Sequence, residues 1–97
     1  MFDLTDRVAI VTGGASGIGR GIVASLREAG ATVIIADINL DHATATAKEL
    51  GASAVRVDVT DRASVKDMYR QVFSEHGGCE IVCSSAGVFP YCPLAER

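Results

Sequence analysis

A glycine-rich segment between residues 12 and 19 has the residue types and spacing to hold a phosphate group. It follows a short apolar run, residues 8–11, that predicts a strand, and it leads directly into a helical pattern. Gly13 allows a tight turn, while Gly17 and Gly19 have no Cβ to block an anion or the neighbouring strand. Because the first N–H groups of a helix lack intrahelical partners and lie at the positive end of its dipole, we predict a pyrophosphate site here.

Two other interpretations of this loop compete with a dinucleotide site. A glycine-rich turn without a ligand is disfavoured, because Asp37 closes a second strand-like run about twenty residues beyond the loop, where a ribose-binding carboxylate is expected. A P-loop is excluded, because Arg20 and Gly21 stand where that motif needs Lys and Ser/Thr. Ser16 is the expected N-cap of the helix that follows the loop.

The composition of the 97 residues excludes several classes of function. The net charge is -3 and no Lys/Arg cluster is present, so we expect no binding to nucleic acid. No run approaches the roughly eighteen apolar residues of a membrane helix, and the acidic N-terminal segment does not resemble a signal peptide. The odd count of 3 cysteines favours reduced thiols. We therefore expect a cytoplasmic protein without membrane contact.

The candidates for a zinc site are His76, Cys79, Cys83 and Cys92. Cys79 and Cys83 flank a predicted strand, which separates their Cα atoms by roughly 13 Å at about 3.3 Å per residue. One tetrahedral ion with sulfur ligands at about 2.3 Å cannot span that separation. We therefore expect unrelated free cysteines and no metal site.

Strand and helix patterns alternate along the whole chain. Strands are expected over residues 8–11, 32–37 and 54–57, and from residue 80 onward. This order predicts an α/β fold, a Rossmann-type doubly wound parallel sheet with strand order 3-2-1-4, incomplete at four strands. The apolar positions at helical spacing are Ile18, Ile22, Val23, Leu26 and Ala29 in the first helix, Leu40, Ala43, Ala47 and Leu50 in the second, and Val65, Met68, Tyr69, Val72 and Phe73 in the third.

From Leu4 to about Gly87 the sequence resembles the start of a short-chain dehydrogenase/reductase. Residues 12–19 match that family's Thr-Gly-x-x-x-Gly-x-Gly loop, which differs from the G-x-G-x-x-G spacing of other dinucleotide folds. The segment Asp58-Val59-Thr60 matches the family segment that reads adenine, in which the carboxylate faces the exocyclic amine. An alternative for Asp58, Thr60 and Asp61 is that they cap the following helix.

Residues 84–87, Ser-Ser-Ala-Gly, stand where the family has Asn-Asn-Ala-Gly, and serine offers a shorter side chain with fewer hydrogen-bonding groups. The resemblance still implies that this segment borders the cofactor ribose. The cofactor-binding residues expected from the loop, the acids and the resemblance are Thr12, Gly13, Ser16, Gly17, Ile18, Gly19, Asp37, Asp58, Val59, Ser85, Ala86 and Gly87.

The family's catalytic Tyr-x-x-x-Lys pair is absent from these residues. Phe73 follows Tyr69 by four positions and Ala95 follows Tyr91, so we expect no catalytic residue here. The resemblance implies that residues 1–97 form a single NAD(P)-binding Rossmann domain, the N-terminal part of a longer fold. Residues 88–97 are then expected to form a loop leading to a helix outside the chain.

The resemblance implies an NAD-dependent oxidoreductase that transfers a hydride between nicotinamide and an alcohol or carbonyl substrate. NAD is expected in preference to NADP, because Asp37 would repel a 2′-phosphate and Ile38, not an arginine, follows it. Full-length members of the family are expected to be homo-oligomers. The alternative is a dinucleotide-binding module without catalysis, or a truncated product.

Overall fold

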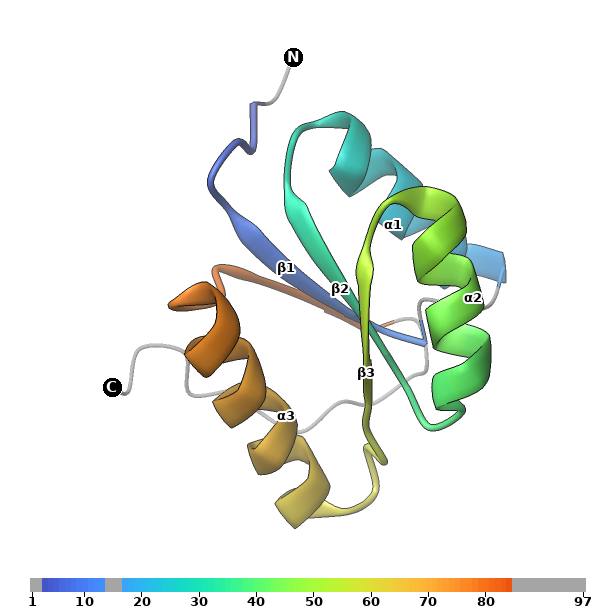
Figure 1. The fold of residues 1–97 in the computed structure, drawn as a ribbon, viewed down its shortest axis with the longest axis vertical. Helices are drawn as coiled ribbons and strands as arrows, with labels where there is room; N and C mark the ends of the chain where they lie inside the picture. Colours follow the sequence, from blue (N-terminus) through green and yellow to red (C-terminus); the bar gives the residue numbers. More distant parts are fainter. Residues whose placement is uncertain (1–2, 14–16, 85–97) are drawn as a thin grey trace.

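A four-stranded parallel sheet with helices on both faces forms the centre of the molecule (Figure 1). The computed structural model describes residues 3–13 and 17–84. The strand order β3-β2-β1-β4 is the predicted one, and the α/β class is confirmed. The elements, in chain order, are β1 (Val8–Thr12), α1 (Gly17–Glu28), β2 (Thr32–Asp37), α2 (Leu40–Leu50), β3 (Ser53–Arg56), α3 (Arg62–His76) and β4 (Ile81–Ser84).

The central strands are apolar along their length because both faces of the sheet are covered. Every residue of β1 is buried, and β2 is buried from Val33 to Ala36. Successive side chains of a strand point to opposite faces, so each strand contributes to two cores. The core under α3 contains Ile10, Ile34, Val65, Met68 and Val72, and the core under α1 and α2 contains Val11, Val23, Ile35, Ala43 and Ala47.

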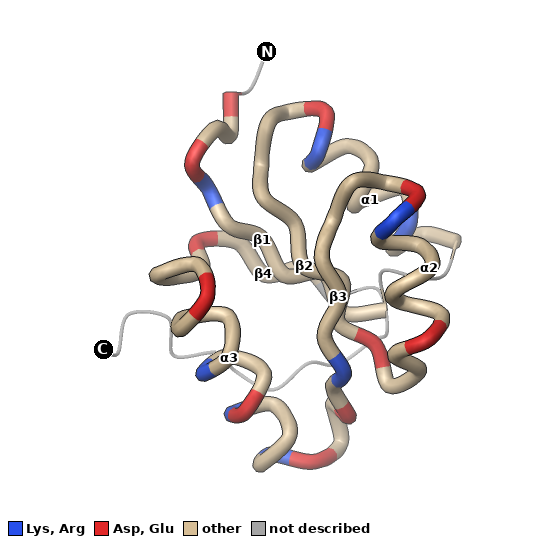
Figure 2. Tube along the Cα trace, viewed as in Figure 1, with Lys and Arg blue, Asp and Glu red and all other residues tan. Residues whose placement is uncertain are grey.

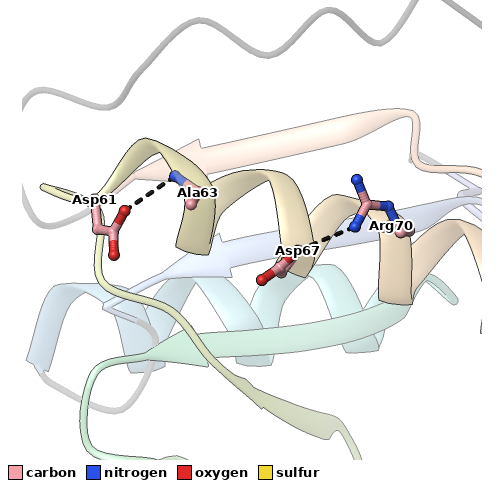
Figure 3. A network of polar contacts seen from close by, with 4 residues as sticks. All are labelled: Asp61, Ala63, Asp67 and Arg70. Atoms are coloured by element: carbon pink, nitrogen blue, oxygen red, sulfur yellow. Dashed lines mark hydrogen bonds and ion pairs between the residues drawn. The ribbon is translucent and has the colours of Figure 1, made fainter.

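Side-chain and glycine caps fix the ends of α2 and α3. Asn39 is the N-cap of α2, and its Oδ1 accepts a hydrogen bond from the His42 amide at 3.0 Å. Asp61 caps α3 in the same way, accepting from the Ala63 amide at 3.0 Å (Figure 3). Gly77 ends α3 at φ 81°, and its amide donates to the Phe73 carbonyl. The capping alternative considered for the segment before α3 therefore applies to Asp61.

Two apolar residues of the predicted helical patterns are not buried. Ile18 is 78% exposed and Leu40 is 43% exposed. The buried face of α1 is centred on Gly19 and Val23, one turn apart, so Ile18 lies at its margin in the first turn. Leu40 opens α2, whose buried face begins at Ala43. The third strand also begins and ends one residue earlier than predicted.

In the described part of the chain, no helix combines the length and the apolar character needed to cross a membrane. Lys, Arg, Asp and Glu occur along all three helices (Figure 2), mostly at exposed positions. Asp67 and Arg70, for example, form an ion pair at 3.2 Å on the exposed side of α3 (Figure 3). Exposed pairs of this kind contribute little to stability.

Gly21 and Gly77 differ in backbone conformation but not in the space around them, because an added Cβ at either residue meets no atom within 4 Å. Replacing each with alanine therefore measures the effect of backbone conformation alone. Gly21 lies inside α1, so Gly21→Ala should stabilise the fold by about 0.5–1 kcal/mol. Gly77 has φ +81°, so Gly77→Ala should destabilise it by about 1–2 kcal/mol. Chemical denaturation of both variants measures these changes. A shift of the same sign in both would contradict the assigned backbone conformations.

Candidate functional site

The carboxyl ends of three neighbouring strands meet around one pocket. Its volume is about 230 Å³. Four of the predicted site residues come together there, from segments that are far apart in the sequence. The lining residues are Gly13 from the end of β1, Ala36, Asp37 and Ile38 from the end of β2, and Val57, Asp58, Val59 and Thr60 from the segment after β3.

The end of β1 is tied into the sheet on both sides. Gly13 has φ 70°, and its amide donates to the Ala36 carbonyl at 2.8 Å. Thr12 is fully buried, and its hydroxyl donates to the Cys83 carbonyl of β4 at 3.5 Å. The Thr12 hydroxyl is thus bonded within the sheet, and Thr12 does not line the pocket. Gly13 lines the pocket, and its positive φ turns the chain out of β1.

Asp37 is partly exposed at the end of β2, and two hydrogen bonds fix its position. Its Oδ1 accepts from the Asn39 amide at 3.1 Å, and its carbonyl accepts from the Val57 amide at 3.0 Å. Because these contacts use backbone donors on two different segments, the end of β2 and the segment after β3 are held together. The carboxylate of Asp37 therefore occupies a defined place in the pocket wall.

Arg56 is a neighbour of Asp37 that the sequence reasoning missed. The two residues are partners in the parallel β2–β3 register, and Arg56 is exposed. Within the described part of the chain no ion pair joins them. Figure 2 shows acidic and basic positions side by side at the end of β3. Both residues stand at the end of a strand, and the register of β2 with β3 is what pairs them.

Asp58 carries the second carboxylate of the pocket. Its Oδ1 accepts hydrogen bonds from the Thr60 hydroxyl at 2.6 Å and the Thr60 amide at 3.0 Å. These two bonds, with a smaller contribution from the Arg56 charge, hold the pKa of Asp58 below its usual value. At neutral pH the site therefore presents an ionised carboxylate, which is a hydrogen-bond acceptor.

Exposed apolar side chains gather at the same edge of the sheet. The large hydrophobic residues exposed in the described ranges are Ile18, Ile38 and Leu40, and each belongs to a segment that follows β1 or β2. Ile38 lines the pocket at 57% exposure, and the half-buried Val59 lines it as well. Exposed apolar surface at a cleft is typical of a place where a ligand binds.

The first turn of α1 leaves room for an anion. Gly17 is exposed, an added Cβ would meet no atom within 4 Å, and its backbone is not left-handed. Neither packing nor conformation therefore requires glycine at this position. The first turn of α1 contains no acidic residue to compensate the helix dipole. The predicted residues Ser16, Ser85, Ala86 and Gly87 lie outside the described residues.

The acceptor groups and apolar side chains of the pocket fit an adenosine group. Two carboxylates, Asp37 and Asp58, accept hydrogen bonds from hydroxyl or amino groups, and the apolar Ile38 and Val59 suit a flat ring. Among the residues that the structure describes, no group of three or more His, Cys, Asp or Glu side chains is arranged to hold a metal ion. Two acceptors beside apolar side chains can recognise a neutral, hydrogen-bond-donating group within a ligand.

Known proteins are similar to this chain in sequence and in fold. Residues 7–97 match the family described as short chain dehydrogenase. Galactitol 2-dehydrogenase of Agrobacterium fabrum is 41% identical over 93 residues, which are 94% of this chain and 36% of that protein. Sorbitol dehydrogenase of Cereibacter sphaeroides is 40% identical over 95 residues, 96% of this chain and 37% of that protein. The chain thus spans little more than a third of the length of these curated relatives.

Solved structures of similar sequence also have a similar fold. The crystal structure of gox2181 superposes with a TM-score of 0.85 at 43% identity, over 89% of this chain and 35% of that one. Pseudomonas aeruginosa RhlG, in a complex with NADP, gives 0.84 at 31% identity, over 90% and 37%. A 3-ketoacyl-(acyl-carrier-protein) reductase from Brucella melitensis, complexed with NADH, gives 0.78 at 32% identity, over 82% and 34%. With nearly its whole length matched to one oxidoreductase family, the chain belongs to the short-chain dehydrogenases.

Proposed function

We propose that the chain is the dinucleotide-binding part of an NAD-dependent oxidoreductase that transfers a hydride between nicotinamide and an alcohol or carbonyl substrate. One observation carries the proposal: Gly13, Asp37 and Asp58 line a single pocket at the carboxyl edge of the sheet. Ligands of open α/β sheets bind at this edge, beside the point where the strand order reverses. The relatives named for galactitol and sorbitol support an alcohol as the substrate class.

Each part of the dinucleotide has a proposed partner in the chain. Asp37 accepts hydrogen bonds from the adenosine ribose, Asp58 accepts one from the adenine amine, and Ile38 and Val59 flank the ring. The bound cofactor supplies the hydride chemistry, while the protein supplies orientation and electrostatics. The residues proposed for the pyrophosphate and the remaining sugar are Gly13, Ser16, Gly17, Ile18 and Gly19 in the loop, and Ser85, Ala86 and Gly87 after β4. Thr12, the first residue of the loop motif, is proposed to act by tying the start of the loop to β4.

The charge at Asp37 supports NAD over NADP, a choice that the family leaves open because its solved members include complexes with both kinds of cofactor. A 2′-phosphate about 4 Å from this carboxylate would cost on the order of 4 kcal/mol per pair of unit charges at an effective dielectric near 20. Arg56 offsets a part of this repulsion, but it is exposed and forms no ion pair with Asp37 within the described residues. Solvent therefore screens its charge.

The Asp37→Asn variant tests this assignment. We expect its affinity for NAD to fall at least about tenfold, since charge-assisted hydrogen bonds contribute roughly 1.5–3 kcal/mol each. Its affinity for NADP should rise, because the repulsion is removed. Isothermal titration calorimetry with both cofactors measures the two changes. Asp41→Asn, an exposed carboxylate four positions later, is the matched control and should leave both affinities unchanged. An unaltered NAD/NADP ratio in Asp37→Asn would disprove the role of Asp37.

Gly17→Ala tests the pyrophosphate site without disturbing the fold. The added methyl group meets no protein atom within 4 Å, so the melting temperature should not fall. It would stand where the loop approaches the phosphates, so NAD affinity should fall at least about tenfold. Gly21→Ala, one turn later in α1 and equally open, is the control and should bind NAD normally. Equal NAD affinity for the two variants would place the phosphates elsewhere.

The 97-residue chain should bind NAD without reducing it. It contains no Tyr-x-x-x-Lys, so it lacks the pair that accepts the proton of the alcohol in this family. Calorimetry reports the binding, and absorbance at the NADH band reports turnover with galactitol or sorbitol. NADH formation above a buffer control would show that another residue in this chain takes over the acid/base role.

A further inference from the structure

Two hydroxyl side chains form hydrogen bonds with Asp58, one with its backbone amide and one with its carboxylate. Ser64, near the start of α3, accepts a hydrogen bond from the Asp58 amide at 2.9 Å. Thr60 donates twice, through its amide and its hydroxyl, to the same carboxylate oxygen, Oδ1 of Asp58. No hydrogen bond from the described residues reaches the other oxygen, Oδ2. Asp58 is therefore fixed at its backbone and at one oxygen of its side chain.

The two bonds from Thr60 decide which oxygen a ligand can use. Because both donors converge on Oδ1, they oppose rotation of the carboxylate and leave Oδ2 as the acceptor for a ligand. Thr60 lines the pocket beside Asp58, so this contact lies in the wall of the binding site itself. A hydroxyl at position 60 thus sets the direction in which Asp58 accepts a hydrogen bond.

Ser64 connects the backbone of Asp58 to the core of the protein. It is absent from the pocket wall and belongs to α3, whose neighbouring residue Val65 is 4% exposed in the core beneath that helix. The Asp61 amide also donates to the Asp58 carbonyl at 2.9 Å and closes the turn between β3 and α3. The position of the Asp58 backbone is therefore set by a helix that is itself packed on the sheet.

We propose that Thr60 and Ser64 are positioning residues that give the site its selectivity for a 6-amino purine over a 6-oxo purine. This proposal rests on the proposed function, in which Asp58 accepts a hydrogen bond from the adenine amine. An ionised acceptor held with one oxygen toward the ring favours an amino group, whereas a carbonyl oxygen at that place would meet a like partial charge. Loss of either hydroxyl frees Asp58 to turn away and weakens this discrimination.

The test compares NAD with nicotinamide hypoxanthine dinucleotide, in which a carbonyl oxygen replaces the adenine amine. We expect the unaltered chain to bind NAD about tenfold more tightly than the analogue, as one charge-assisted hydrogen bond implies. Thr60→Val and Ser64→Ala should each lower this ratio at least about threefold and leave the affinity for the analogue unchanged. Thr60→Ser keeps the hydroxyl and should restore the ratio.

The controls separate positioning from folding and from the proposed function. Thr44→Val, at an exposed threonine on α2, should change neither affinity. Equal losses for both dinucleotides, together with a lower melting temperature, would show that the two hydroxyls serve only the fold. An unchanged ratio in both variants, or no preference in the unaltered chain, would also overturn the inference and leave NAD binding intact. Absence of any NAD binding would instead refute the proposed function.

Discussion

Parallel pairing of β1 with β2 on one side and β4 on the other is the constraint on which the rest of the structure depends. It requires every connection to cross back over the sheet, so helices cover both faces and the central strands are buried on each. Together with the parallel pairing of β2 with β3, it brings the carboxyl ends of β1, β2 and β3 to one edge. Residues at positions 13, 37 and 58 line one pocket only because of this pairing.

Much of the fold follows from local sequence patterns. The apolar run that forms β2 ends at Asp37 as predicted, and Gly51 and Gly77 end helices in left-handed conformations. Ile18 illustrates why the remainder was missed. Its spacing fits the apolar stripe of α1, but the surface that a helix buries depends on how it lies across the sheet, and the first turn of α1 leaves Ile18 exposed.

The candidate site was predictable to the extent that it consists of strand ends. Gly13, Asp37, Asp58 and Val59 were singled out from the sequence and line the pocket together. Arg56 and Ser64 were not. Strand register places Arg56 beside Asp37, and Ser64 accepts a hydrogen bond from the Asp58 amide, six residues earlier in the chain. Contacts of this kind depend on three-dimensional arrangement, and residue type alone does not indicate them.

The two aspartates of the pocket are held by hydrogen bonds to segments on opposite faces of the sheet. Asp37 accepts from Asn39, the N-cap of α2, while Asp58 donates through its amide to Ser64 in α3 on the opposite face. In a protein of this size, each layer can open locally by its own fluctuation. A molecule that touches both carboxylates would join those two openings into one cooperative unit. The rigidity of the whole domain would then depend on whether its pocket is filled.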